Sequence, residues 1–407
     1  MDTPTLLAYS SRLEQELRQN ILPFWMREAV DAPRGTFHGE LTNDLVVNPT
    51  APRGALLTCR ILWTFAAAYR AHRDPAYLPM ADLAYTDLLA RFADETHGGV
   101  FWSINSDGTP RETRKQIYGQ AFGIYALTEY HLASGRREPL DGAIALYHLL
   151  EQHASDPQHG GYFEAYARDW SPIADQRLSA VDLNEPKSQN THLHIMEAYT
   201  NLLRVWPDAT LRRRQTALVE LMLTRILNPA THHLGLFFST DWQLRSDRIS
   251  YGHDIEAAWL LTEAAEVLGD PALLARTRTH ALAIADATLR EGTDADGGIF
   301  NEGGPSGITD ARKEWWPQAE AVVGFLNAAQ LAPGDGRYLA AALRCWDFIE
   351  ARLIDRQHGE WFRGVDRAGR VIPTFEKVSF WKCPYHNGRT GLEAPARLRA
   401  LAGGASH

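Results

Sequence analysis

Cysteine is scarce in this sequence. Only Cys59, Cys345 and Cys383 occur among 407 residues, and they are widely spaced, with no CxxC pair. A disulfide framework and a structural zinc site therefore have no support. Cys383 also lacks the surroundings of a catalytic nucleophile, so we expect it to have a packing role.

Long apolar runs and blocks of positive charge are missing as well. No stretch of 18 apolar residues occurs, which argues against a membrane-spanning helix. The net charge of −9 contains no basic cluster, so a nucleic-acid-binding surface is not expected. The first 20 residues show no basic segment followed by an apolar core, as a secretory signal would. We expect a soluble, cytoplasmic protein that binds neither nucleic acid nor membrane.

Tryptophan and histidine, by contrast, are plentiful. The chain has 12 Trp and 16 His. An indole ring is a large, flat platform with a single hydrogen-bond donor, and sugar-binding clefts use such platforms. The composition therefore directs attention to carbohydrate-binding sites.

A short glycine–aromatic motif recurs along the chain. Its copies are RGTF at 34–37, GGVF at 98–101, GGYF at 160–163, LGLF at 234–237, GGIF at 297–300 and GEWF at 359–362. The final Phe residues are 64, 62, 74, 63 and 62 positions apart, so the repeat is about 63 residues long with one insertion. Turn residues and strand-like aromatic residues follow several copies, which predicts short β-hairpins.

Between these motifs the sequence has helical periodicity. Apolar residues recur at i, i+3, i+4 and i+7 in two segments of each repeat. The first helix of each pair is expected at 61–72, 119–133, 192–206, 253–268 and 317–331, and the second at 77–92, 140–153, 212–227, 273–289 and 338–353. With an N-terminal helix at about 5–28 and a C-terminal helix at about 387–402, the total is twelve.

Six helix pairs with six hairpins predict an all-α, closed (α/α)6 barrel. An open solenoid is the alternative, but its terminal repeats would need polar outer faces, and here the last repeat carries the richest chemistry. No linker rich in Pro, Ser or Gly divides the chain, so we predict a single domain over residues 1–407.

Unusual polar and aromatic residues gather where the inner helices begin. In such a barrel the inner helices run in the same direction, so their N-terminal ends meet at one mouth. Six distant segments would then converge on one pocket. The candidates are Arg60, Tyr118, Asn190, His194, His253, Glu256, Trp315, Trp316 and His386.

Helical spacing refines this set. Asn190 and His194 are four residues apart, and His253 and Glu256 are three apart, so each pair shares a helix face. His192 lies about 200° from His194 around a helix, so the two cannot chelate one metal ion. No metal site is predicted.

Histidines without a metal or cofactor point to proton transfer. A helix N-terminus disfavours the imidazolium form, so a histidine there is poised as a base near neutral pH. Two such bases on opposite faces of a C–H bond beside a carbonyl remove a proton from one side and return it on the other. An arginine and a third histidine would stabilise the enediolate oxygen. This pattern is typical of a racemase or epimerase.

At these residues the sequence resembles the N-acylglucosamine 2-epimerase superfamily, and within it the cellobiose 2-epimerases most closely. The matching segments are APRGALLTCRILWTFAAAYR, TRKQIYGQAFGIYAL, NTHLHIMEAY, GHDIEAAWLL, WWPQAEAVVGFLNA and KVSFWKCPYHNGR. They extend from about residue 52 to 394, nearly the whole chain. The family's fold is an (α/α)6 barrel, in agreement with the repeat count.

The resemblance implies an isomerase that opens a reducing-end sugar and inverts C2 through a cis-enediolate. His253 and His386 match the two acid/base residues, and His194 matches the histidine that assists ring opening. Residues that match substrate-binding positions are Arg60, Tyr118, Asp182, Asn190, Glu256, Trp316 and Trp381. Cys383 stands where the family commonly has Gly, and its side chain is expected to narrow the site.

The leading hypothesis is therefore a cofactor-independent 2-epimerase acting on cellobiose and similar β-1,4 disaccharides, as a monomer or homodimer. A mannose 2-epimerase or an aldose–ketose isomerase of mannose would use the same enediolate. An (α/α)6 glycoside hydrolase would need facing carboxylates, for which Asp254, Glu256 and Glu320 are candidates. A sugar-binding or protein-interaction module without catalysis is the non-enzyme alternative, but both paired histidines are present.

Overall fold

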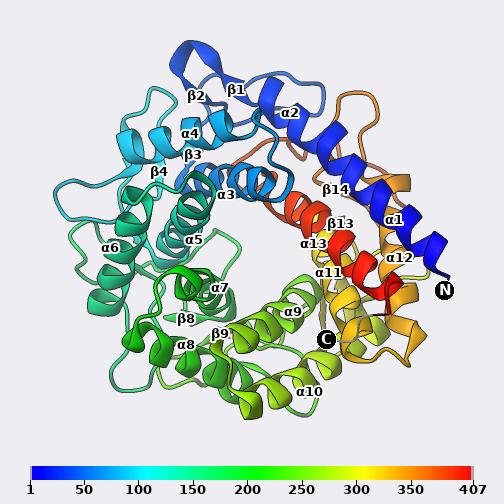
Figure 1. Cartoon of the computed structure of the whole chain (residues 1–407). Coiled ribbons are helices and arrows are strands. Elements are labelled where there is room, and N and C mark those ends of the chain that lie inside the picture. The colour runs from blue at the N-terminus through cyan, green and yellow to red at the C-terminus, as the bar shows by residue number, and fades with distance from the viewer. Residues whose placement is uncertain (1, 405–407) are drawn as a thin grey trace.

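Two concentric rings of helices make up the computed structural model of the chain, which describes residues 2–404 (Figure 1). The inner ring consists of α3 (Ala55–His72), α5 (Ile117–Ser134), α7 (Gln189–Val205), α9 (Tyr251–Leu268), α11 (Trp315–Leu331) and α13 (Tyr385–Ala402). The outer ring consists of α1 (Thr3–Glu16) with its continuation α2 (Leu22–Arg27), α4 (Leu78–Asp87), α6 (Glu138–His153), α8 (Ala209–Leu221), α10 (Pro271–Ala287) and α12 (Gly336–Arg352).

Several helices of the outer ring contain a π-helical turn. One, η1 (Leu17–Ile21), joins α1 to α2, so these two form one continuous rod and the described residues contain the twelve predicted helices. The others end outer helices: η3 (Leu88–Phe92), η4 (Met222–Ile226) and η5 (Thr288–Gly292). A short 3₁₀ turn, η2 (Ala32–Arg34), lies after α2.

The burial of each helix follows its place in the rings. In α5 every residue from 117 to 130 is buried, because the outer ring covers one face and the neighbouring inner helices cover the others. In α6 burial is restricted to Pro139, Leu140, Ala143, Leu146, Tyr147 and Leu150. This spacing is the apolar stripe of a helix with one solvent face.

The rings are closed between the first and last repeats. Helix α13 packs against both α3 and α11 and against α1 on its outer side. Leu41 and Val378 form an antiparallel bridge, and the Thr3 hydroxyl donates a hydrogen bond to the Ala402 carbonyl at 3.2 Å. The prediction of a closed barrel is confirmed. No helix among residues 2–404 is long and apolar enough to cross a membrane.

In five helix pairs, a short strand before the inner helix pairs with a short strand after the outer helix. The strands just before inner helices are β3 (Arg53–Gly54), β6 (Lys115–Gln116), β8 (Lys187–Ser188), β10 (Ile249–Ser250) and β13 (Lys313–Glu314). Their antiparallel partners, which follow the next outer helix, are β4 (Ser103–Ile104), β7 (Ala165–Tyr166), β9 (Phe237–Phe238), β11 (Glu302–Gly304) and β14 (Gly364–Val365), respectively.

The predicted hairpins coincide with some of these strands. Strand β4 pairs with β5 (Pro110–Glu112) and β11 pairs with β12 (Gly307–Asp310), so the motifs that end at Phe101 and Phe300 precede hairpins. The first motif lies on β2 (Thr36–Phe37), which pairs with β1 (Val30–Asp31). The pairing with strands before the inner helices was not predicted.

In four inner helices the side chain at the fourth position bonds the backbone of a glycine–aromatic motif. We call these contacts clamps. Gln120 in α5 donates to and accepts from the backbone of Val100, at 2.8 Å each. Gln318 in α11 makes the same pair with Ile299, at 2.6 and 2.8 Å. In the other clamps, His192 accepts from the Tyr162 N–H at 2.8 Å and Asp254 accepts from the Leu234 N–H at 2.9 Å.

Buried lysines form a second set of contacts near the starts of the inner helices. A fully buried Lys from the strand or loop before an inner helix pairs with an Asp from the turn before the motif. The pairs are Lys115–Asp94 at 2.8 Å, Lys187–Asp156 at 2.6 Å, Lys313–Asp294 at 2.8 Å, and Lys377–Asp355. These contacts hold the hairpins over the helix N-termini.

Candidate functional site

The first two turns of the inner helices surround a cavity of about 430 Å³. This volume lies in the range of small-molecule sites, roughly 300–1,000 Å³. All ten residues expected to form the site line it: Arg60, Tyr118, Asp182, Asn190, His194, His253, Glu256, Trp316, Trp381 and His386. They come from distant parts of the sequence and meet because the inner helices share one direction.

Two positions of the inner helices supply seven of the ten cavity-lining residues that lie on these helices. Positions two and six are four residues apart and therefore share a face. The second position holds Tyr118, Asn190, Trp316 and His386, and the sixth holds Arg60, Phe122, His194, Glu256 and Glu320. The fourth position points away from this face, which is why His192 contacts Tyr162 in the hairpin and not the cavity.

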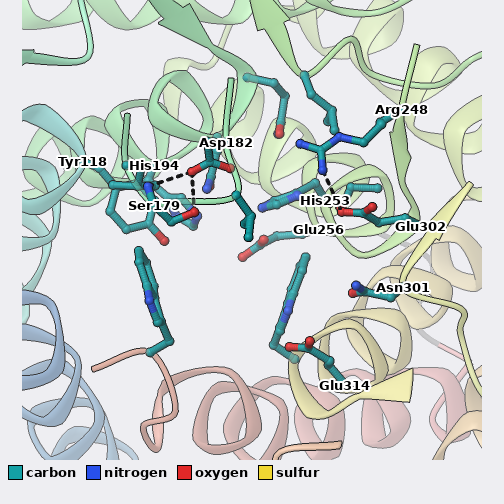
Figure 2. A pocket seen from close by; sticks show the side chains of 18 of the residues that line it. Tyr118, Ser179, Asp182, His194, Arg248, His253, Glu256, Asn301, Glu302 and Glu314 are labelled. Atoms are coloured by element: carbon teal, nitrogen blue, oxygen red, sulfur yellow. Dashed lines mark hydrogen bonds and ion pairs between the residues drawn. The ribbon is translucent and has the colours of Figure 1, made fainter. Parts of the chain in front are cut away.

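The cavity is polar at both ends (Figure 2). Tyr118, His194 and Asp182 gather on one side, and Arg248, Glu302 and Asn301 on the other. His253 and Glu256 lie between the two groups in this view.

Each expected catalytic histidine has its Nδ1 atom engaged, which leaves Nε2 for the cavity. His194 Nδ1 is 2.8 Å from Glu197 Oε2, and His386 Nδ1 is 2.7 Å from Glu320 Oε1. A carboxylate accepts a hydrogen bond, so both rings carry their proton on Nδ1 and present an unprotonated Nε2. This is the form of a general base.

His253 is held differently, by a hydroxyl group. Its Nδ1 lies 2.8 Å from Ser250 Oγ, which is either donor or acceptor. Its ring is 4.6 Å from that of Trp316, which also lies 5.7 Å from the ring of His386. Trp316 therefore contacts both histidines.

Burial favours the neutral form of all three histidines in the free protein. Burial and, to a smaller degree, His194 lower the pKa of His253 to about 3. Burial, followed by the charges of Arg60 and Arg389, places the pKa of His386 well below its usual value. The pKa of His194 is also lowered by burial, although Glu197 opposes the change.

Arg60 is a buried guanidinium that lacks a carboxylate partner among residues 2–404; its side chain belongs to a residue only 3% exposed. Its Nη2 donates to the Tyr118 hydroxyl at 2.7 Å, and the group lies over the rings of Phe122 and Tyr385 at 4.4 and 5.0 Å. Burying a charge without a counterion is costly. A positive charge kept in this way suits a ligand that becomes negative.

Cys383 differs from the expectation. It is fully buried, its Sγ lies 3.9 Å from Arg60 Nη1, and the cavity lining defined by residues 2–404 does not include it. The thiol packs against the Arg60 guanidinium and does not narrow the cavity. Its predicted packing role agrees with this position.

Asp182 lines the rim, in the loop before β8. Its Oδ2 accepts hydrogen bonds from the backbone N–H and the hydroxyl of Ser179, both at 2.8 Å. The carboxylate therefore also stabilises its own loop, which carries Ala180 and Val181 over the cavity.

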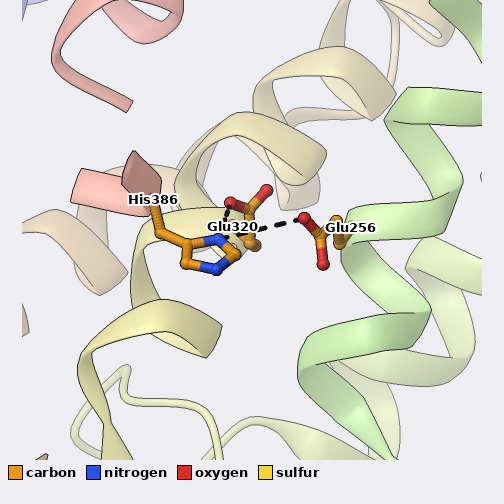
Figure 3. A group of neighbouring side chains, drawn as sticks. All are labelled: Glu256, Glu320 and His386. Carbon is orange, nitrogen blue, oxygen red and sulfur yellow. Dashed lines mark hydrogen bonds and ion pairs between the residues drawn. The ribbon is translucent and has the colours of Figure 1, made fainter. Parts of the chain in front are cut away.

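Glu256, Glu320 and His386 each place one potential ligand atom within 4.8 Å of the others (Figure 3). Arg389 Nη2 donates to Oε1 of both glutamates, at 2.6 Å each. The guanidinium thus already supplies the positive charge that a metal ion would bring. The donor set fits an ion pair better than a metal centre.

Sequence reasoning missed part of the site. Glu197 and Arg389 were not singled out, and Glu320 was considered only as a hydrolase carboxylate. The signal for Glu320 was present, since it occupies the same sixth position as Arg60 and His194. The lining residues Arg248, Asn301, Glu302, Glu314 and Arg363 lie in or next to hairpin strands, where no helical register reveals direction.

The comparisons with known proteins agree with this geometry. The family model described as N-acylglucosamine 2-epimerase matches residues 35–386. A Bacteroides fragilis protein named cellobiose 2-epimerase is 46% identical over 94% of this chain and 97% of its own length. A Dictyoglomus turgidum protein of the same name is 38% identical over 97% of this chain and its own full length.

Solved structures are similar as well. The cellobiose 2-epimerase structure from Bacillus thermoamylovorans has a TM-score of 0.91 at 37% identity and covers 96% of this chain and 99% of its own. That from Spirochaeta thermophila has a TM-score of 0.88 at 41% identity and covers 98% of each chain. From its sequence, its fold and the residues around its cavity, this chain belongs to the N-acylglucosamine 2-epimerase family.

Proposed function

We propose that the protein is a sugar 2-epimerase that interconverts glucose-type and mannose-type reducing ends, with cellobiose and related β-1,4 disaccharides as substrates. Relatives that are 46% and 38% identical to this chain carry the name cellobiose 2-epimerase. The observation that carries the proposal is the placement of two neutral histidines. His253 on α9 and His386 on α13 flank α11 and line one cavity, and each has its Nδ1 occupied.

The reaction begins with ring opening. His194 is assigned to this step, because its unprotonated Nε2 accepts the proton of the anomeric hydroxyl as the C1–O5 bond breaks, and the imidazolium that results gives this proton to O5. The Glu197 carboxylate on Nδ1 stabilises the charge that the ring gains. The product is an open-chain aldehyde with an acidic C–H at C2.

Inversion follows by two proton transfers. One of His253 and His386 removes the C2 proton, the electron pair moves toward C1, and O1 becomes negative. The other histidine enters the step as an imidazolium, with a proton taken up from solvent, and delivers it to the opposite face of C2 as the carbonyl at C1 re-forms. The first histidine releases the proton it removed to solvent, so the protons balance. Arg60 supplies the stabilising charge for O1, because its buried guanidinium forms no ion pair with a carboxylate of residues 2–404.

Trp316 and Trp381 are proposed to stack on the sugar rings, since both indoles line the cavity and are half-buried. Tyr118, Asn190, Glu256 and Asp182 are proposed to hold hydroxyl groups. Asn190 Oδ1 and Glu256 Oε2 lack a hydrogen-bond partner within residues 2–404, so a hydroxyl of the substrate would satisfy each.

The reaction as written requires no cofactor, because one proton leaves C2, one returns, and no electrons are gained or lost. We therefore propose a metal- and cofactor-independent enzyme. We also propose a single domain over 1–407, a cytoplasmic location, and a monomeric or homodimeric state.

The hydrolase alternative fits less well. Inverting glycosidases place their carboxyl groups about 6.5–9.5 Å apart to admit a water molecule. Glu256 and Glu320 hydrogen-bond the same Arg389 nitrogen and have oxygens within 4.8 Å of each other. Asp254 pairs with His233 at 2.7 Å and serves the clamp to Leu234.

Incubation of the purified protein with cellobiose in D2O tests the proposal. Deuterium is expected at C2 of the 4-O-glucosyl-mannose product and of recovered cellobiose, measured by NMR and mass spectrometry. A ketose as the main product would instead identify an aldose–ketose isomerase. Absence of exchange with cellobiose, lactose, glucose and mannose would refute enediolate chemistry.

A further inference from the structure

Arg389 lies at the centre of a buried network that connects two of the cavity's histidines. Its Nη1 donates to Glu197 and to the Tyr385 hydroxyl, and its Nη2 donates to Glu256 and Glu320 at 2.6 Å each. The guanidinium is 1% exposed and the three carboxylates are at most 2% exposed. It therefore serves three acidic groups from three different helices.

Two of these carboxylates orient histidines. Glu197 accepts from His194 through Oε2 and from Arg389 through Oε1. Glu320 accepts from both His386 and Arg389 through Oε1, while its Oε2 accepts from the Trp259 indole at 3.0 Å. Figure 3 shows Glu320 and Glu256 facing the Nδ1 side of the His386 ring.

We propose that Arg389 is a positioning residue, whose guanidinium fixes the two carboxylates that orient His194 and His386. It does not line the cavity in the part of the chain that the structure describes, so it acts through these partners. The planar guanidinium fits the role because it offers several donors at fixed angles, which a lysine does not. This inference rests on the proposed epimerase function only for its kinetic test.

The electrostatic consequence is specific. Arg389 lowers the pKa of His194 and His386, after the larger effect of burial, and so keeps both rings neutral beside their carboxylates. Without it, burial and mutual repulsion of the carboxylates would favour protonation of the network. The charged and titratable groups that face the two rings are Arg60, Tyr118, Glu197, His253, Glu256, Glu320, Tyr385 and Arg389.

The main test compares Arg389→Met with Arg397→Met as a matched control. Arg397 lies two turns further along α13 and over the same Trp259 ring, at 5.9 Å against 4.7 Å for Arg389, but it bonds Gln330 and Asn327. We expect R389M to reduce kcat at least 100-fold and to move the acidic limb of kcat/KM upward by about one pH unit. R397M should retain the wild-type limb.

Arg389→Lys and guanidinium rescue of Arg389→Ala complete the set. The lysine variant is expected to keep the wild-type limb with lower kcat, because it restores charge without the fixed geometry. Low concentrations of guanidinium chloride should raise the kcat of R389A and leave R397A unchanged. If R389M fails to fold, the double variant R389M/E256Q, which removes one buried carboxylate together with the cation, is compared with E256Q alone, because Glu256 itself is proposed to bind the substrate.

NMR titration of labelled histidines separates this inference from the proposed function. The pKa of His194 and His386 should rise in R389M whether or not the wild type epimerises any sugar. Unchanged pKa values together with wild-type turnover in a folded R389M would overturn the positioning role. Failure of the wild type to exchange C2 protons would instead count against the proposed function alone.

Discussion

At the level of single residues, buried arginines of this protein fall into two kinds, those paired with a carboxylate and those without one. Arg60 and Arg53 illustrate the contrast. Arg53 is buried with the carboxylate of Asp87, whereas Arg60 has aromatic rings, a tyrosine hydroxyl and a thiol around it. A paired buried charge is needed by the fold, while an unpaired one is retained for another reason.

Replacement of Arg60 should therefore mainly lower activity, whereas replacement of Arg53 should mainly lower stability. Arg60→Met is expected to lower kcat by about 10²- to 10³-fold, because it removes stabilisation of the enediolate oxygen. Its melting temperature should stay constant or rise, since a buried charge is replaced by an apolar side chain. Arg53→Met should be destabilised by about 1–3 kcal/mol, because the buried Asp87 carboxylate loses the Arg53 guanidinium and keeps only Arg91 and Thr36 as close partners. Thermal unfolding and steady-state kinetics measure both; destabilised R60M would contradict the account.

The two-base assignment makes a second prediction at this scale. In His253→Asn and His386→Asn, epimerisation is expected to be abolished, because each inversion needs a histidine on each face of C2, one to remove the proton and one to return it. Each variant should still exchange the C2 proton of one epimer with D2O, cellobiose in one variant and 4-O-glucosyl-mannose in the other. Exchange of both epimers by a single variant would show that one base serves both faces.

At the level of helices and hairpins, the fourth-position clamps explain residues that look functional in the sequence. His192 is fully buried, its Nε2 accepts from Tyr162 and its Nδ1 lies 2.6 Å from the Ser188 carbonyl, four residues earlier. Gln318 likewise reaches Ile299 and the Glu314 carbonyl four residues earlier, at 3.1 Å. A histidine and a glutamine thus perform the same task in two repeats.

The equivalence predicts that His192→Gln preserves folding and activity at pH 7. Burial lowers the pKa of His192 to about 4 in the folded state, against about 6.5 in the unfolded chain. The unfolded state therefore binds more protons between these values, and wild-type stability falls as the pH falls from about 6.5 to 4. H192Q does not lose this stability, because it has no histidine to protonate. Its free energy of unfolding relative to wild type should therefore increase by about 1.4 kcal/mol for each unit by which the pH falls in this window.

Denaturant unfolding at pH 7 and pH 5 checks this prediction. His192→Leu is the control, because it leaves the Tyr162 N–H unpaired and should be about 1–3 kcal/mol less stable than H192Q at both pH values. An H192Q variant as unstable as H192L at pH 7 would show that the two clamps are not interchangeable.

The same elements show what the sequence could and could not predict. Helical periodicity and the repeat of about 63 residues predicted the twelve helices and their closure into a ring, because these patterns are local and periodic. The resemblance and the helix starts indicated ten of the residues that line the cavity; their roles stay predictions. The clamps, the Lys–Asp pairs and the Arg389 network join residues far apart in the chain, and no local pattern reveals such partners.

At the level of the whole molecule, the ring joins its own ends. Helices α1 and α13 pack together, and the Thr3–Ala402 hydrogen bond places the first and last described helices within contact. Each repeat has a neighbour on both sides. The N-terminal ends of the inner helices meet around the cavity, whereas the turns from inner to outer helices lie at the opposite end of the barrel.

A circular permutant should consequently fold and work. If the present ends are joined by a short flexible linker and the chain is opened between Pro207 and Asp208, the α7–α8 turn is cut far from the cavity. Activity close to that of the native chain is expected. Opening between Glu185 and Pro186, just before β8, should leave a folded ring with strongly reduced activity, because this loop covers the cavity. Circular dichroism and the cellobiose assay measure both outcomes, and an unfolded first permutant would contradict ring closure.

The register of the inner helices has a consequence for redesign. Hairpin clamps use the fourth position, while most of the inner-helix residues that line the cavity come from the second and sixth positions, so chemistry and anchoring occupy separate faces of one helix. Among the sixth positions, Phe122 carries no polar group although its ring lies 4.9 Å from His194 and 4.4 Å from the Arg60 guanidinium. New acid or base groups could be introduced there without touching Gln120, the clamp of the same helix. Barrels built on this plan can change the reaction they catalyse while keeping the contacts that hold them closed.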